Sequence, residues 1–198
     1  MKKQSTLFPQ DAIKIVAELD LKEAKSTAAL VKASVESQCS QIEIAGSIRR
    51  KKLKIHDIDF VVVAKSDVEW QRINEKLKQL KARPNCSGDS VIKAFVPCQD
   101  GLFQVDFYRA KPSTFGIHLL VRTGSADHNM WLAGLAFSKG MRLKYSEGLI
   151  KDGMAVAGET EQGVFEALEL PHPSPTKREI VDCKPVWMPP KIPDGVPG

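Results

Sequence analysis

The pattern of apolar and polar positions predicts helices and strands along the first half of the chain. Residues 10–39 have helical spacing in two pieces, and the second piece would bury a stripe formed by Ala24, Ala28, Val31 and Val35. Apolar runs, some alternating with polar residues, predict strands at residues 41–45, 57–64, 90–97 and 102–109. The first half is therefore expected to form a sheet covered by helices.

Polar residues mark where two of these helices begin. Asp20 with Glu23, and Ser66 with Glu69, have the spacing of capping boxes. The helix after Ser66 would place four large apolar residues on one side: Trp70, Ile73, Leu77 and Leu80. Trp70 is thus expected in the core rather than on a base-stacking surface. Arg83-Pro84-Asn85 would end that helix in a loop.

The periodicity changes at Lys111-Pro112-Ser113, where helical segments replace strands. Helices are expected at residues 113–122, from a Ser125 cap to Gly140, and at 160–168, with strands at 142–145 and 148–151. A proline-rich tail follows. The predicted fold class is α+β, with a mixed sheet flanked by helices and a small helix-rich second domain. The predicted domains are residues 1–111 and 112–183, with a tail at 184–198.

Three acidic residues on the predicted sheet are the candidate catalytic and metal-binding residues. Asp57 and Asp59 are two apart in one strand and would project from the same face. Asp106 lies in a strand that could be adjacent, where neighbours are about 4.8 Å apart. Three carboxylates suit Mg²⁺ first and Mn²⁺ second, whereas zinc would call for His or Cys at ligand spacing. Two such ions can hold the attacking and leaving oxygens of a phosphoryl transfer.

Charge and cysteine usage narrow the class of protein. The formal net charge is +5 with a pI near 9.0, and a basic cluster at residues 49–54 directly precedes the acidic pair, which favours a polyanionic partner. Cys39, Cys86, Cys98 and Cys183 have no C-x-x-C spacing, so no zinc or redox motif is indicated. No apolar segment reaches the ~20 residues that span a bilayer. We expect an intracellular protein, cytoplasmic or nucleoid-associated (nuclear in a eukaryote), without membrane contact.

Several motifs in order along the chain resemble the family X DNA polymerases, the group that includes DNA polymerase beta. The loop Gly46-Ser47-x-Arg49-Arg50, the acidic pair and Val105-Asp106-Phe107 would fit any nucleotidyltransferase. The more specific matches are Thr123-Gly124-Ser125 with Asn129, Lys139-Gly140, a segment at residues 159–168, and Pro175-x-x-Arg178-Glu179. The resemblance covers roughly residues 10–180.

The resemblance implies a nucleotidyltransferase palm followed by a nucleotide-selecting thumb. Asp57, Asp59 and Asp106 would be the catalytic residues and would bind two Mg²⁺ ions, with Mn²⁺ as an alternative. Asp106 is the candidate to accept the proton of the primer 3′-hydroxyl. The residues expected to bind the nucleotide are Gly46, Ser47, Arg50, Gly124, Ser125 and Asn129. Ser47 and Arg50 would hold the triphosphate, Gly124 and Ser125 would line the sugar, and Asn129 would face the base edge. For Arg49, a phosphate contact and a structural ion pair are equally open.

The departures from the family pattern concern nucleotide choice. Val121-Arg122 stands where many members have two aromatic residues that help exclude a ribose 2′-hydroxyl. Ala133 replaces an arginine that tracks the template, and Ala126 replaces an acid near the nascent base. The sequence therefore predicts acceptance of ribonucleotides and relaxed fidelity.

Three functions remain open at this point. The first is DNA-directed DNA synthesis on primer-template or gapped DNA from deoxynucleoside triphosphates, in short-gap repair, by a monomer. The second is template-independent or small-substrate nucleotidyl transfer with the same three acids. The third, a non-catalytic nucleic-acid-binding module, gives no reason to keep all three acids together with Ser47 and Arg50. With only about 40 residues before the Gly-Ser loop, a lyase function is not expected.

Overall fold

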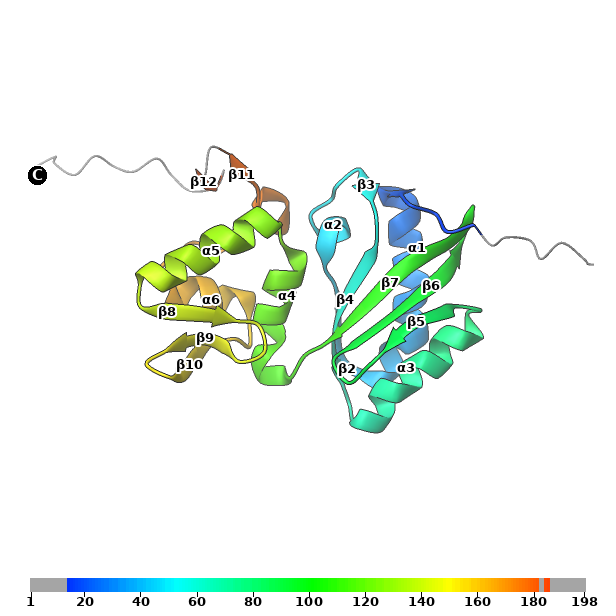
Figure 1. The fold of residues 1–198 in the computed structure, drawn as a ribbon, viewed down its shortest axis with the longest axis horizontal. Coiled ribbons are helices and arrows are strands. Elements are labelled where there is room, and N and C mark those ends of the chain that lie inside the picture. The colour runs from blue at the N-terminus through cyan, green and yellow to red at the C-terminus, as the bar shows by residue number, and fades with distance from the viewer. Residues whose placement is uncertain (1–13, 182–183, 186–198) are drawn as a thin grey trace, which may run out of the picture.

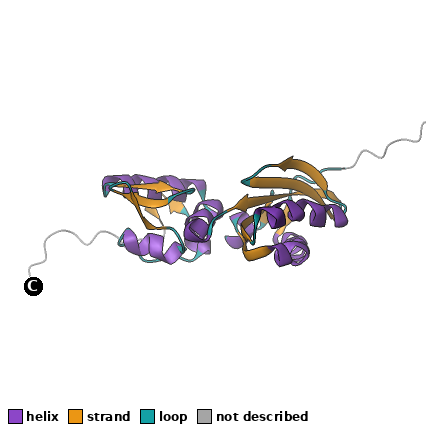
Figure 2. Cartoon of the chain, turned by 90° about the horizontal axis from the view of Figure 1, so that it is seen from below, coloured by secondary structure: helices purple, strands orange, loops and turns teal. Residues whose placement is uncertain are grey.

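A computed structural model describes residues 14–181 and 184–185 (Figure 1). Two groups of elements follow one another along the chain, each around its own hydrophobic core (Figures 1 and 2). We call them the N-terminal lobe (β1–β7) and the C-terminal lobe (α4–β12). The predicted α+β class, with a mixed sheet and helices, is confirmed. The predicted domain limits at 111 and 183 stay predictions.

The N-terminal lobe is built on a five-stranded sheet in the order β2-β4-β7-β6-β5. Its strands are β2 (Cys39–Ile44), β4 (Ile58–Ala64), β5 (Arg83–Ser87), β6 (Val91–Cys98) and β7 (Gly101–Arg109). β4 and β7 are parallel, and all other neighbours are antiparallel. The four strands expected from the sequence are therefore present, and the parallel pair brings the two acid-bearing strands into contact.

One face of this sheet is covered by two helices (Figure 2). They are α1 (Leu21–Val35) and α3 (Asp67–Gln79). Both predicted caps are confirmed, because Asp20 accepts a hydrogen bond from Glu23 N and Ser66 from Glu69 N. The predicted apolar stripe of α1 is buried, and Trp70 is fully buried in the core as expected. The opposite face of the sheet is left for the acids and for α4.

The smaller N-terminal elements include a short helix at the edge of the sheet. β1 (Leu19–Asp20) pairs with β3 (Lys54–Ile55), and η1 (Glu36–Gln38) joins α1 to β2. The short helix α2 (Gly46–Arg49) contains most of the Gly-Ser-x-Arg-Arg loop and faces α4 in Figure 1. This places the loop between the two lobes.

The C-terminal lobe contains three helices and a small antiparallel sheet. The helices are α4 (Phe115–Thr123), α5 (Ala126–Ser138) and α6 (Glu161–Ala167), with η2 (Pro112–Thr114) before them. The sheet has the order β10-β9-β8, formed by β8 (Met141–Lys144), β9 (Gly148–Lys151) and β10 (Met154–Ala157). The chain continues through η3 (Pro175–Lys177), β11 (Ile180–Val181) and β12 (Lys184–Pro185).

Helix α4 has two apolar sides and joins the lobes. Ile117 and Leu120 lie in the core of the C-terminal lobe. Phe115 and Leu119 pack instead with four residues of the sheet and linker, namely Ala45, Val61, Val63 and Ala110. A helix that is apolar on both sides is buried between two layers, as observed here.

The structure corrects two of the predicted elements and adds a strand that was not predicted. Residues 14–20 are not helical: Ile15 bridges to Leu102, and Leu19–Asp20 is a strand, so sheet contacts with β7 and β3 replace the first helical piece. Residues 83–85 begin β5 instead of forming a loop, because Pro84 lies in an edge strand, where proline is tolerated. Strand β10 was not predicted, since Met154–Ala157 does not alternate. The predicted tail lies almost wholly outside the described residues, and none of the described helices is long and apolar enough to cross a membrane.

Candidate active site

The three acids come together on the face of the sheet that α1 and α3 leave uncovered. The parallel register of β4 and β7 sets Asp59 beside Asp106, and Asp57 directly precedes β4. One carboxylate oxygen of each residue lies within 4.8 Å of those of the other two. The two-residue period of a strand predicted that Asp57 and Asp59 project together, Asp106 was expected to face them from an adjacent strand, and the structure brings the three side chains together.

The electrostatics of this acidic triad favour a cation. Burial, reinforced by the charges of Asp57 and Asp106, raises the pKa of Asp59 to about 7. Burial and the Asp106 charge also raise the pKa of Asp57. Three carboxylates at this separation repel one another when ionised, and oxygen-only donors of this kind fit Mg²⁺ or Mn²⁺. The residues present therefore fit a divalent metal site.

Asp106 is held by three donors, which orient its carboxylate. Gln104 Nε2 donates to Oδ1 at 3.0 Å and the Tyr108 hydroxyl donates to Oδ2 at 3.1 Å. Lys93 Nζ forms an ion pair with Oδ2. Sequence reasoning missed Lys93, although it lies opposite Asp106 in the antiparallel register of β6 and β7. The alternation Ile92, Lys93, Ala94 could have placed it on the acidic face.

Gly46 lets the backbone of α2 approach the triad. Its φ is +59°, and a Cβ at this position would lie 2.0 Å from Asp59 Oδ2. Glycine is therefore required here for both conformation and space. The next residue, Ser47, has a buried hydroxyl that makes no hydrogen bond with any described residue. A buried hydroxyl without a partner, in the residue that follows Gly46, is available to a ligand.

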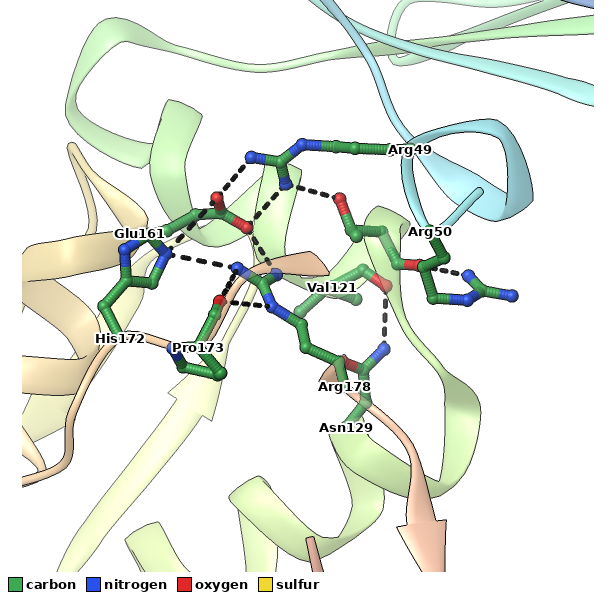
Figure 3. A network of polar contacts seen from close by, with 9 residues as sticks. Arg49, Arg50, Val121, Asn129, Glu161, His172, Pro173 and Arg178 are labelled. Atoms are coloured by element: carbon green, nitrogen blue, oxygen red, sulfur yellow. Dashed lines mark hydrogen bonds and ion pairs between the residues drawn. The ribbon is translucent and has the colours of Figure 1, made fainter. Parts of the chain in front are cut away.

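Arg50 reaches the C-terminal lobe rather than the triad. Its Nη1 donates to the carbonyl oxygen of Thr123, while its Nε is buried and has no hydrogen-bond partner among the described residues (Figure 3). A Cβ on Gly124, whose φ is +72°, would approach Arg50 Nη1 to 3.1 Å. The predicted nucleotide-binding residues Gly46, Ser47, Arg50 and Gly124 therefore gather where α2 meets the end of α4.

Ser125 and Asn129 have structural partners in this conformation. Ser125 Oγ accepts a hydrogen bond from His128 N at 3.2 Å and donates to Arg178 O at 3.2 Å, so it caps α5 as predicted. Asn129 Nδ2 donates to Val121 O at 2.7 Å (Figure 3). Their roles toward a sugar and a base stay predictions.

Arg49 forms an ion pair, the structural alternative of the two that the sequence left open. It donates to both carboxylate oxygens of Glu161, at 2.8 Å and 2.6 Å, and to Thr123 Oγ1 at 2.7 Å. Arg178, fully buried, donates to Glu161 Oε1 at 2.6 Å (Figure 3). Despite burial, these hydrogen bonds and positive charges lower the pKa of Glu161. We call Arg49, Glu161 and Arg178 the interlobe network.

Two histidines lie next to the motifs in sequence, His56 before Asp57 and His128 after Ser125. His56 is exposed, and its Nδ1 lies 3.2 Å from Ala17 O, as for a turn residue. His128 is fully buried. Burial, together with the Arg178 charge, lowers the pKa of His128 to about 4. Neither side chain joins the acidic triad.

Comparisons with known proteins show what the chain is similar to. Residues 118–179 match the family model described as DNA polymerase beta thumb, a stretch that lies within the C-terminal lobe. DNA polymerase IV of Saccharomyces cerevisiae (strain ATCC 204508 / S288c) is 31% identical over 77 residues. That match covers 39% of this chain and 13% of the length of the yeast protein.

Two solved structures of Leishmania infantum polymerase beta share the fold. The ternary P/T complex has a TM-score of 0.72 at 20% identity, covering 82% of this chain and 77% of that one. The ternary gap complex has a TM-score of 0.73 at 19% identity, covering 82% and 71%.

The chain is thus similar to polymerases of family X in the thumb match and in its fold. The resemblance inferred from the sequence motifs is thereby confirmed. The thumb match begins at His118 in α4 and ends at Glu179, so it includes both Glu161 and Arg178. The interlobe network therefore joins the thumb match to the loop that carries Ser47.

Proposed function

We propose that this chain is a DNA-directed DNA polymerase that adds nucleotides to a primer 3′-hydroxyl by two-metal phosphoryl transfer. The observation that supports this most directly is the acidic triad, with its oxygens within 4.8 Å, in a polymerase beta fold. Asp57, Asp59 and Asp106 would hold two divalent ions, Mg²⁺ or Mn²⁺. When bound, such ions stabilise the negative charge that develops on the transferring phosphoryl group.

The chain's own residues would perform the remaining tasks. Asp106, fixed by Gln104, Lys93 and Tyr108, would accept the proton of the 3′-hydroxyl. The unpartnered Ser47 hydroxyl would donate to the triphosphate. Arg50 would add a charge-assisted hydrogen bond from its Nε, which has no partner among the described residues, while Nη1 stays bonded to Thr123 O. A bound triphosphate would thus lie next to one contact between the lobes.

The proposed substrates are primer-template or gapped DNA and deoxynucleoside triphosphates, in short-gap repair synthesis by a monomer inside the cell. The solved structures with this fold are described as P/T and gap complexes of another polymerase. The net charge of +5 would make DNA binding depend strongly on salt.

Sugar selection follows from where two side chains of α4 lie. Val121 packs against the core of the C-terminal lobe. The Arg122 guanidinium lies over the Tyr108 ring, 3.6 Å from its centroid. Neither residue therefore provides an aromatic ring beside Gly124. We therefore propose that ribonucleotides are accepted alongside deoxynucleotides.

The function is tested by extension of a 5′-labelled primer on a gapped duplex, with Mg²⁺ and Mn²⁺ compared and the four nucleotides offered singly. Addition of only the template-directed nucleotide supports the proposal. Equal addition of all four nucleotides, or equal extension of an unprimed strand, would instead indicate template-independent transfer. No extension with either ion would overturn the assignment as a polymerase.

A further inference from the structure

A pocket of about 600 Å³ lies between the two lobes, beyond the acidic triad along the same face of the sheet. The N-terminal lobe contributes the ends of β4 and β7 and the loop before β6. The C-terminal lobe contributes His118 and Arg122 of α4 and the turn at Tyr145 between β8 and β9. Small-molecule sites commonly have this size and lie between domains. None of the residues proposed to bind metal or triphosphate lines this hinge pocket.

The charges of the hinge pocket favour an anion with polar groups. Its lining includes the cations Arg109, Lys111 and Arg122 and the carboxylates Asp67 and Asp89. Arg109 is matched by an ion pair with Asp67. Among the described residues, neither Lys111 nor Arg122 pairs with a carboxylate. Two cations are thus available to a ligand, and Asp89 can accept a hydrogen bond from it.

Planar groups in the hinge pocket favour an aromatic ring. The Arg122 guanidinium carbon lies 3.6 Å from the centroid of the Tyr108 ring and 5.9 Å from that of the Tyr145 ring. Tyr145 is 52% exposed on its turn, so one side of its ring is accessible. Tyrosine rings and guanidinium planes are the groups on which unpaired bases stack.

A buried nitrogen of the hinge pocket lacks a partner. His118 is 7% exposed, and its Nδ1 makes no hydrogen bond with any described residue. Its ring packs edge-on against Tyr145, with centroids 5.3 Å apart at 90°. Buried polar side-chain atoms are usually satisfied, so this nitrogen is available to a ligand.

We propose that the hinge pocket binds a nucleotide unit, separate from the nucleotide of the proposed polymerase reaction. The base stacks on the accessible side of the Tyr145 ring and hydrogen-bonds to His118 Nδ1, and the phosphate binds Lys111. The unit is either a free nucleoside monophosphate or an unpaired nucleotide of a strand, which share this chemistry. Tyr108 forms one wall and donates to Asp106, so an occupied pocket adjoins the acidic triad. The proposal does not require that the chain polymerises DNA.

The test is isothermal titration calorimetry of the full chain in EDTA, which removes metal-dependent binding at the triad. The probes are AMP, a short single-stranded oligodeoxynucleotide, adenosine and inorganic phosphate. Each is titrated into wild type, Tyr145→Ala and Lys111→Ala. The matched controls are Phe137→Ala, an exposed aromatic residue on α5, and Lys25→Ala, an exposed lysine on α1.

Loss of the stacking partner in Tyr145→Ala is expected to weaken binding of AMP or the oligonucleotide about tenfold or more. Lys111→Ala is expected to weaken the same ligands several-fold while leaving adenosine unchanged, and both controls should bind as wild type. Binding of AMP alone assigns the pocket to a free nucleotide, and binding of the oligonucleotide alone assigns it to a strand. The proposal is overturned if neither binds, if phosphate binds as well as AMP, or if the pocket variants match their controls.

Discussion

Arg49 and Glu161 form a bidentate ion pair that joins α2 of the N-terminal lobe to α6 of the C-terminal lobe. The Glu161 side chain is 6% exposed, and its carboxylate also receives Arg178. A buried carboxylate shared by two arginines is satisfied only while all three residues stay in place. The relative position of the lobes is therefore linked to the loop that carries Ser47.

Replacing Glu161 with glutamine should destabilise the chain by about 3–5 kcal/mol, because Arg178 would be left buried without its negative partner. Urea denaturation followed by circular dichroism gives the free energy of unfolding. Glu159→Gln, at an exposed residue near the start of α6, is the matched control and should lose less than about 0.5 kcal/mol. Equal stability of the two variants would show that the interlobe network contributes nothing.

Asp106→Ala should reduce primer extension by about three orders of magnitude or more, because one metal ligand and the proposed proton acceptor are lost together. Binding of gapped DNA, measured by fluorescence anisotropy, should change less than about twofold, since it depends on basic surface. Asp100→Ala, in the exposed turn between β6 and β7, provides the control. Unchanged turnover in Asp106→Ala would remove the proposed mechanism.

Gly46→Ala should reduce activity strongly, because the added Cβ would meet Asp59 Oδ2 and φ is +59°. Gly134→Ala provides the contrast. Gly134 lies in α5 with no atom within 4 Å of an added Cβ, so this change should stabilise the chain by up to about 1 kcal/mol. Extension assays and melting temperatures of both variants are compared. An active Gly46→Ala enzyme would contradict the described approach of α2 to the triad.

Lowering the pH should decrease the free energy of unfolding, because His128 is buried in its neutral form. Its pKa falls from 6.5 to about 4 in the folded chain, so between these values the unfolded chain binds the proton and the folded chain does not. The free energy of unfolding should therefore decrease as pH falls from 6.5 towards 4, by up to about 3 kcal/mol from this residue. Asp59, with its raised pKa, acts in the opposite sense.

The free energy of unfolding of the wild type must therefore be compared with that of His128→Gln at each pH. Asp59 contributes equally to the pH dependence of both proteins, so its effect cancels in the difference. The pH dependence of the difference in unfolding free energy isolates the histidine, and NMR titration of the ring measures its pKa directly. A folded-state pKa of 6.5 or above would contradict this prediction.

Discrimination against ribonucleotides should be weak. Without an aromatic wall at Val121 and Arg122, we expect matched deoxy- and ribonucleotides to differ by less than about a hundredfold in single-turnover incorporation, as for pockets that merely tolerate an added hydroxyl. Misinsertion should also be frequent, because Ala126 and Ala133 on α5 are exposed and lack polar groups that could sense the nascent pair. Strong rejection of the ribonucleotide, or high accuracy, would contradict the respective expectation.

The sequence predicted best what depends on local periodicity. The same-face projection of Asp57 and Asp59 follows from the strand repeat, and the caps at Asp20, Ser66 and Ser125 follow from short-range hydrogen bonding. Contacts between distant segments were not accessible in this way. Lys93 meets Asp106 through strand register, and Arg178 meets Glu161 through the packing of the C-terminal lobe. Residues 14–20 were mistaken for a helix because their partners, Leu102 and β3, are remote in sequence.

The contact between the two lobes is apolar at one end and polar at the other. At one end lie Val61, Val63, Phe115 and Leu119, whose apolar contacts have no preferred direction. At the other end lies the interlobe network, whose hydrogen bonds require defined distances and angles. If one lobe rotated slightly against the other, the apolar contacts would shift without being lost, whereas the polar contacts would break one at a time. The apolar cluster would then be the pivot of this rotation. The contacts of Arg49 and Arg50 with the C-terminal lobe would determine which angles between the lobes are stable.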